Sequence, residues 1–298
     1  MELNNMKSDE LFRGKRVIIS GGSRGIGLSI AKKLAKEGAK ISILAKTTEP
    51  HPKLSGTIFT AAEEIEACGG KALPIVTDIR HEDQIKSAVE RTVEEFGGID
   101  IVINNASAIS LTPTTYTEMK RFDLMFSVNV RGTFMLSKEC IPHLMNGENP
   151  HILSLSPPLD MNPEWFAPSL AYTISKFGMS QCILGLSEEL RSEGIAANAL
   201  WPHSIIATAA IGNMVMGEEA FPHCRKPEII ADAAKIILSK KAKEHTGNFH
   251  IDDELLSNEG ITDFSIYRMD ISKPLWKDFF VPKNTPQVEP LLDIMNPN

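Results

Sequence analysis

The residue pair best suited to chemistry in this chain is Tyr172 and Lys176, which stand four positions apart in a helix-like segment. Side chains at that spacing project from one face of a helix. A phenol with a pKa of about 10 is a poor proton donor or acceptor at neutral pH, but a neighbouring cation stabilises the phenolate and lowers that pKa. The pair is therefore expected to move a proton to or from a substrate. The alternative is a packed tyrosine beside a surface lysine, so other features must support the hypothesis that the pair transfers a proton.

A glycine-rich turn near the N-terminus supplies the first of those features. The run Ser20, Gly21, Gly22, Ser23, Arg24, Gly25, Ile26, Gly27 follows an apolar strand pattern and precedes a helical one. Glycines in such a turn allow unusual backbone conformations and a close approach of the main chain to a ligand. The first amides of the following helix, and its dipole, favour an anion at the same place. The context predicts a cradle for a dinucleotide pyrophosphate instead of a turn that merely closes a loop.

The residues that end the next strands bear on which dinucleotide is bound. A carboxylate at the end of the second strand selects the free ribose hydroxyl of NAD, whereas a cation accommodates the 2′-phosphate of NADP. That place holds Lys46, with Arg24 as a second cation nearby, so the sequence predicts NADP. Asp78 ends the third strand and is placed to meet the adenine or to cap the next helix. Asn105 follows the fourth strand, where its amide holds the cofactor or ties strands together.

Alternating strand and helix patterns must position these residues. Branched apolar runs occur at 16–20, 40–45, 72–77, 100–104, 150–155, 195–200 and 248–251. Helical spacing occurs at 25–37, 57–68, 82–96, 118–145, 169–193 and 228–239. This alternation predicts an α/β fold with a doubly wound parallel sheet of seven strands in a single domain, 1–270. Residues 271–298 show little periodicity and are expected to form a C-terminal tail that wraps the surface or a partner subunit.

The composition excludes several classes of partner. The formal net charge of the 298 residues is −7 and no long basic run occurs, which disfavours nucleic acid. No stretch is apolar enough for a membrane span. The four cysteines are scattered and the histidines show no metal-binding spacing, so we expect reduced thiols and no catalytic metal. With a polar start and no peroxisomal Ser-Lys-Leu ending, the sequence predicts a cytoplasmic protein.

Taken together, these motifs resemble those of the short-chain dehydrogenase/reductase family. The family's Thr-Gly-x-x-x-Gly-x-Gly motif is matched by residues 20–27 with serine first, its Asn-Asn-Ala-Gly by residues 104–107, and its Tyr-x-x-x-Lys pair by Tyr172 and Lys176. The resemblance extends from residue 12 to about 270. It implies that Tyr172 exchanges a proton with the substrate oxygen and that Lys176 lowers its pKa and holds the nicotinamide ribose. It also implies that Asn129 anchors a water chain, and that a dimer or tetramer forms through 118–145 and 169–193.

The chain departs from the family at the serine that hydrogen-bonds the substrate oxygen. The family position falls on Pro157, which has no hydroxyl. Ser156 lies one residue earlier and either is presented by the turn at Pro157 and Pro158 or only ends the strand. Loss of one such donor costs about 3 to 4 kcal/mol of barrier.

Three functions follow for the chain. The leading one is an NADP-dependent oxidoreductase that interconverts a hydroxyl and a carbonyl on an apolar small molecule of lipid, fatty-acyl or steroid type. Two rivals are a low-turnover NADP(H)-binding module with a role in lipid homeostasis or interaction, and a nucleotide-sugar epimerase. The apolar substrate is suggested by the stretch 203–225, where the resemblance implies a lid over the substrate, and by four further side chains if they face the pocket. The lid carries Ile205, Ile206, Ile211, Met214, Val215, Met216 and Phe221, and the four are Met161, Trp165, Phe166 and Trp201.

Overall fold

The protein is described by a computed structural model that covers residues 11–50 and 56–294. Seven strands form one sheet in the order β3-β2-β1-β4-β5-β6-β7, and every neighbouring pair is parallel. The strands are β1 Arg16–Ser20, β2 Lys40–Ala45, β3 Lys71–Val76, β4 Ile101–Asn104, β5 His151–Ser154, β6 Ala196–Trp201 and β7 Phe249–Ile251. The predicted doubly wound parallel sheet of seven strands is confirmed. In this strand order β1 and β4 are neighbours, and the crevice at their carboxyl ends is where open α/β sheets bind ligands.

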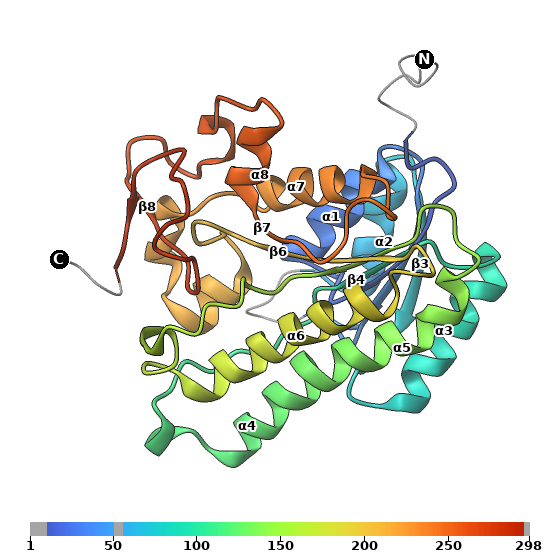
Figure 1. The fold of residues 1–298 in the computed structure, drawn as a ribbon, viewed down its shortest axis with the longest axis horizontal. Helices are drawn as coiled ribbons and strands as arrows, with labels where there is room; N and C mark the ends of the chain where they lie inside the picture. The colour runs from blue at the N-terminus through green and yellow to red at the C-terminus, as the bar shows by residue number, and fades with distance from the viewer. Residues whose placement is uncertain (1–10, 51–55, 295–298) are drawn as a thin grey trace.

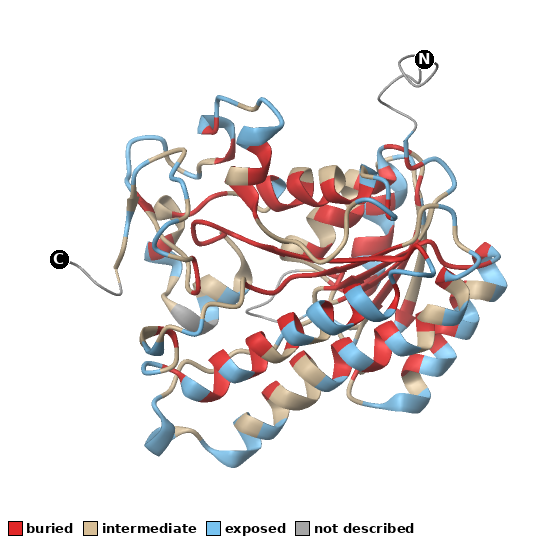
Figure 2. Ribbon diagram, viewed as in Figure 1, coloured by how far each residue is buried: buried red, intermediate tan, exposed pale blue. Residues whose placement is uncertain are grey.

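Helices cover both faces of the sheet (Figure 1). One layer contains α1 Gly25–Ala35, α2 Ile58–Ala67 and α7 Glu228–Ser239, and the other contains α3 Glu82–Phe96, α5 Gly132–Leu144 and α6 Leu170–Glu189. Strand β1 shows why both layers form: Val17 and Ile19 pack into one core, whereas Ile18 packs into the other. Successive strand side chains point to opposite faces, so a wholly apolar strand needs cover on both. The buried strands lie between helices whose outer faces are exposed (Figure 2).

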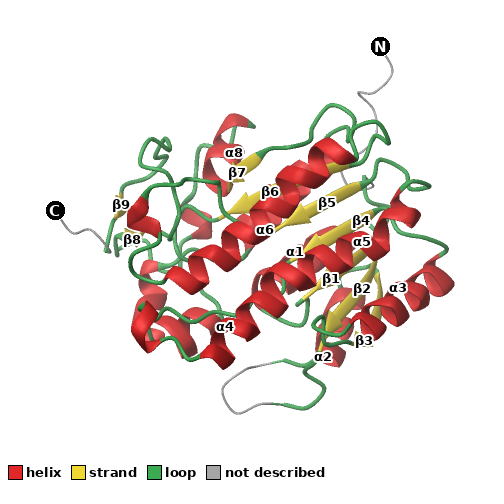
Figure 3. Cartoon of the chain, turned by 60° about the horizontal axis from the view of Figure 1, so that its bottom comes forward, coloured by secondary structure: helices red, strands yellow, loops and turns green. Residues whose placement is uncertain are grey.

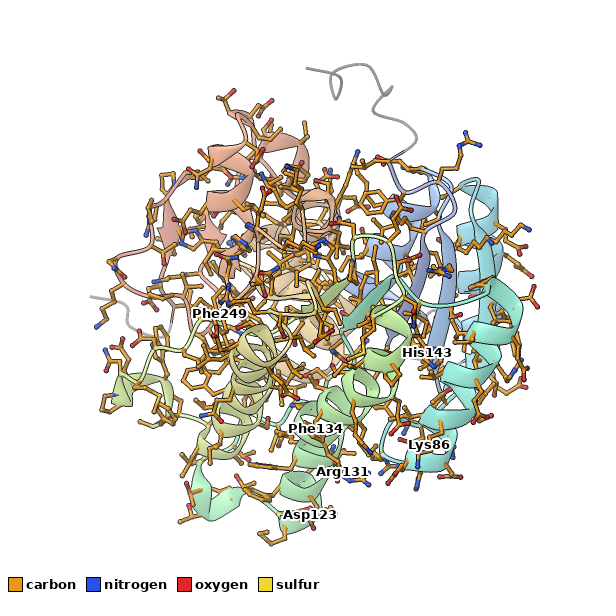
Figure 4. All side chains as sticks on the ribbon, turned by 45° about the vertical axis from the view of Figure 1, so that its right-hand side comes forward. Lys86, Asp123, Arg131, Phe134, His143 and Phe249 are labelled. Atoms are coloured by element: carbon orange, nitrogen blue, oxygen red, sulfur yellow. The ribbon has the colours of Figure 1, made fainter. Side chains whose placement is uncertain are left out.

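The segment expected to be one helix at 118–145 is interrupted. It consists of α4 Met119–Met125, a π-helical stretch Phe126–Arg131 and α5, which follow one another along one rod. Figure 4 labels Asp123, Arg131, Phe134 and His143 along it. The wider turn holds Asn129, whose side chain bonds to the backbone of a neighbouring loop, and single π turns of this kind often occur at functional sites.

The chain beyond β6 adds short elements on the far side of the sheet from β3. A π-helical turn Ile211–Val215 and a 3-10 stretch Glu218–His223 precede α7, and α8 Asp252–Asn258 follows β7. Beyond residue 270, β8 Leu275–Trp276 pairs with β9 Leu291–Leu292 in a parallel ladder separate from the main sheet (Figure 3). Over the described ranges 11–50 and 56–294, no helix combines the length and the apolar character needed to cross a bilayer.

Candidate functional site

The glycine turn between β1 and α1 is built by close backbone contacts. Gly21 has a φ of +68°, and a Cβ there would lie 2.9 Å from the Cα of Ala106. A Cβ on Gly27 would lie 2.5 Å from both Asn105 Nδ2 and the carbonyl oxygen of Gly21. Only glycine therefore lets the start of α1 meet the turn this closely. The arrangement fits a dinucleotide phosphate, because it brings the amides at the start of α1 to the carboxyl edge of β1 and β4.

Asn105 joins the two strands that flank this crevice. Its Nδ2 donates to the carbonyl oxygens of Ser20 at 3.1 Å and Gly21 at 2.9 Å. The Ser20 hydroxyl in turn accepts from the backbone N–H groups of Asn105 and Ala106, each at 3.2 Å. Of the two roles predicted for the Asn105 amide, the structure shows the tie between β1 and β4.

The charged residues at the ends of β2 and β3 form a second part of the site. Lys46 Nζ lies 3.5 Å from Asp78 Oδ2, and the Lys46 side chain is 59% exposed. Arg80 binds Asp78, and its Nη2 donates to Asp78 Oδ2 at 2.6 Å. Hydrogen bonding from Arg80 is the main reason that the pKa of Asp78 lies well below its usual range. The prediction that Asp78 caps the next helix is wrong, because the N-cap position of α3 is occupied by His81.

Arg24 lies on the other side of the turn. Its Nη2 donates to the carbonyl oxygen of Gly56 at 2.7 Å, and its buried Nε has no hydrogen-bond partner among the described residues. Burial lowers the pKa of this guanidinium from its ordinary value. Ser23, in the same turn, is buried and Ile26 packs partly against the core.

Asn129 links the loop after β4 to the helix that carries the tyrosine. Its side chain accepts from Ala108 N–H at 2.7 Å and donates to Ala108 O at 2.9 Å. Asn129 Nδ2 also donates to Ser175 Oγ at 2.9 Å, and Ser175 Oγ donates to Tyr172 O at 2.8 Å. The structure thus brings Asn129 next to the Tyr172 turn of α6.

Tyr172 and Lys176 are both buried on α6, with exposed fractions of 6% and 2%. Lys176 Nζ donates to Leu155 O at 2.7 Å and lies 4.9 Å from the centre of the Trp201 ring. Burial lowers the pKa of Lys176 to about 7, opposed by the carboxylate of Asp278. Burial and Asp278 together raise the pKa of Tyr172 above its ordinary value. Desolvation thus acts against the lowering of the phenol pKa that the family resemblance implies for Lys176, and that lowering stays a prediction.

Ser156, predicted to replace the missing family serine, lies two residues beyond the end of β5. It is fully buried, and its hydroxyl makes no hydrogen bond to any described residue, Tyr172 included. The carbonyl oxygen of Pro157 accepts from Ser180 Oγ at 2.6 Å, which holds the turn against α6. A role for Ser156 in binding the substrate oxygen stays a prediction.

Aromatic side chains surround Tyr172. Trp165, Phe166 and Trp201 belong to this cluster as expected, but Met161 is exposed and lies outside it. Of the expected lid residues, Ile205 and Ile206 are instead packed in hydrophobic cores. The site also contains Asp278 and Phe280, which were not predicted because the tail lacks periodicity. The signal available was the apolar patch Trp276, Phe279, Phe280, Val281 in an otherwise polar segment.

Comparisons with known proteins agree with this geometry. Residues 15–216 match the family model for short chain dehydrogenase. The chain is 60% identical over 268 residues to hydroxysteroid dehydrogenase-like protein 2 of Rattus norvegicus, an alignment that covers 90% of this chain and 51% of that protein. The chain therefore spans about half the length of that relative.

Solved structures show the same fold. A putative dehydrogenase from Xanthomonas campestris superposes with a TM-score of 0.89 at 50% identity, covering 91% of this chain and 99% of the other. A short chain dehydrogenase from Burkholderia cenocepacia in complex with NADP has a TM-score of 0.67 at 27% identity, covering 81% and 97%. The chain belongs to the short-chain dehydrogenase/reductase family of oxidoreductases, which bind nicotinamide cofactors.

Proposed function

We propose that the protein is an NADP-dependent oxidoreductase that interconverts a hydroxyl and a carbonyl on an apolar small molecule of lipid, fatty-acyl or steroid type. The observation that carries this proposal is the place of Tyr172, one helical turn before Lys176 and in one buried cluster with the rings of Trp165, Phe177, Trp201 and Phe280. A proton donor set in an aromatic enclosure suits a carbonyl on an apolar skeleton. The name of the rat relative supports a hydroxysteroid-type substrate.

The cofactor would be held along the carboxyl edge of the sheet. The backbone of Ser20, Gly21, Ser23, Gly25, Ile26 and Gly27 would hold the pyrophosphate, and Asn105 keeps this turn in place. Lys46 and Arg24 would meet the 2′-phosphate and Asp78 the adenine. The NADP complex of the Burkholderia cenocepacia relative supports this choice. When bound, the nicotinamide supplies or accepts the hydride.

The chain's own groups handle the proton. Tyr172 donates it to the substrate oxygen in the reducing direction and accepts it in the oxidising direction. Lys176 binds the nicotinamide ribose, and Asn129 positions the loop and helix through which the proton is resupplied. Because burial lowers the pKa of Lys176 to about 7, its charge is present mainly below that pH.

The test compares Tyr172→Phe with the wild type in NADPH oxidation over a panel of apolar aldehydes and ketones. Removing the hydroxyl takes away general acid catalysis, so kcat should fall by roughly 100- to 10,000-fold while NADPH affinity is retained. Tyr116→Phe is the matched control, because Tyr116 is exposed and outside the cluster. Equal rates for Tyr172→Phe and the wild type would remove Tyr172 from the chemistry.

A second candidate function is a low-turnover NADP(H)-binding module with a role in lipid homeostasis or interaction. Pro157 at the family serine position and the buried Ser156 hydroxyl favour it, because the substrate oxygen then lacks a hydrogen-bond donor beside Tyr172. Tight NADPH binding without oxidation across the panel, unchanged in Pro157→Ser, would support this function over the first.

The proposal includes a homodimer or homotetramer in the cytoplasm. Phe134 on α5 and Leu184 on α6 are about half exposed, and these helices lie side by side on one face of the molecule (Figure 4). Large apolar side chains on adjacent helices are typical of subunit contacts. The four cysteines, all unpaired, are consistent with a reducing compartment.

A further inference from the structure

The tail residue Phe280 lies at the centre of the aromatic cluster around Tyr172. Its ring centre is 5.9 Å from that of Tyr172, 6.0 Å from Trp201, 6.1 Å from Trp165 and 5.5 Å from Phe177. Its neighbours belong to α6, to β6 and to the segment that leads into α6, whereas Phe280 comes from beyond residue 270. Phe280 is only 2% exposed.

The backbone of Phe280 is strained. Its φ is +63°, and Asn149 is the other non-glycine residue with a positive φ in the described ranges. A bulky residue in the left-handed region costs free energy that its surroundings must supply. Here Asp278 N–H donates to His203 O at 2.9 Å, and Phe279 O accepts from Trp201 Nε1 at 2.7 Å. These two bonds hold the segment so that the Phe280 ring turns inward.

The inward ring closes the site. With Tyr172 6% and Lys176 2% exposed, both side chains offer a substrate little surface while the Phe280 ring lies inward. Phe177 lies on α6 and Trp201 on β6, and Trp165 lies in the short 3-10 turn Pro163–Trp165, where its Nε1 donates to Asp160 Oδ2 at 2.8 Å. Phe280 is held by a strained segment without helix or strand of its own. Phe280 is therefore the neighbour that can be displaced without moving α6 or β6.

We propose that Phe280 is a specificity-determining residue whose ring fills the place of the substrate's apolar part, so that only compounds apolar enough to replace it there gain access to Tyr172. This inference rests on the function proposed above and adds the rule by which substrates are selected. Small polar carbonyl compounds do not compensate for the lost ring contacts and are excluded. Long-chain and fused-ring compounds replace those contacts with their own.

Asp278 is carried by the same segment, two residues before Phe280. Its carboxyl group accepts from Phe279 N–H at 2.6 Å, and burial raises its pKa to about 7, opposed by that hydrogen bond and by Lys176. Withdrawal of the segment takes this carboxyl group away from Tyr172 and Lys176, whose pKa values it raises. The movement that displaces the ring therefore also lowers the pKa of the Tyr172 phenol toward its ordinary value.

The experiment measures binding of dodecanol by calorimetry, without cofactor, so that it is independent of turnover. Phe280→Gly removes the ring and suits the positive φ, so this variant should bind dodecanol roughly 10- to 100-fold more tightly than the wild type. Phe12→Ala is the matched control, because Phe12 is also 2% exposed but lies in the core before β1. It should leave the affinity unchanged. Phe280→Leu, which keeps an apolar side chain, should give an intermediate affinity.

A second measurement follows the tail of the wild type by limited trypsin cleavage after Lys283, which is exposed. Saturating dodecanol should speed this cleavage, whereas butanol at the same concentration should not. Unchanged affinity in both Phe280 variants, or cleavage that dodecanol leaves unchanged or slows, overturns the inference. Neither readout depends on oxidation or reduction, so a failure of Tyr172→Phe to lower kcat would refute the proposed function and leave this test intact.

Discussion

The contact between Gly27 and Asn105 gives the sharpest prediction, for the variant Gly27→Ala. The added Cβ would lie 2.5 Å from Asn105 Nδ2, whereas ordinary contacts begin at 3.4 Å, so the groups must separate by 3.4 − 2.5 = 0.9 Å. That movement breaks the hydrogen bonds from Asn105 to the carbonyl oxygens of Ser20 and Gly21. Each lost bond costs about 1 kcal/mol and overpacking costs about 1 to 3 kcal/mol, so the free energy of unfolding should fall by about 3 to 5 kcal/mol.

The assay is thermal unfolding with and without NADPH, together with NADPH titration. A loss of this size lowers Tm by roughly 5 to 8 °C in a chain of this length. NADPH affinity should fall by at least about 10-fold, because the amides that would hold the pyrophosphate move with the turn. The control is Gly185→Ala on α6, where a Cβ meets no atom within 4 Å and should stabilise the helix by about 0.5 to 1 kcal/mol. A Gly27→Ala protein with wild-type Tm and wild-type NADPH affinity would refute the argument.

Two further variants test electrostatics. Burial acts to raise the pKa of Asp100, but its hydrogen bonds from Arg16, including one from Nη2 at 2.6 Å, hold that pKa below its ordinary value. This contribution to stability is therefore present above about pH 4 and is lost as pH falls through the lower folded pKa. Asp100→Asn should lower the free energy of unfolding by about 2 kcal/mol at pH 7, because its hydrogen bonds from Arg16 lose their charged acceptor. In urea unfolding, the difference between variant and wild type should narrow between about pH 5 and pH 2, and a constant difference would contradict the assignment. Lys46→Ala should weaken NADPH roughly 10-fold and NADH little, because Arg80 still holds Asp78. Equal losses of the two affinities would show that Lys46 does not meet the 2′-phosphate.

The predicted helices and strands agree with the observed ones where the periodicity of apolar side chains alone determines the element. Wholly apolar strands and helices with one apolar face follow from side-chain periodicity, so the seven-stranded parallel sheet was predictable. Helix α7 was predicted at its observed bounds, 228–239. The rod at 118–145 was not, because its π turn depends on Asn129 bonding to Ala108, a residue 21 positions earlier. Long-range hydrogen bonds of this kind leave no periodic signal.

The sequence by itself determined the fold, the family and the residues gathered around the crevice, because glycine spacing, strand ends and a pair four residues apart on a helix are local features. Only the tertiary structure decided the electrostatic state of those residues. Tyr172 and Lys176 are four positions apart in any helix, but the burial that raises one pKa and lowers the other comes from packing. The inward ring of Phe280 and the carboxylate of Asp278 arrive from more than a hundred residues away. Desolvation depends on everything that surrounds a group, and no local pattern records it.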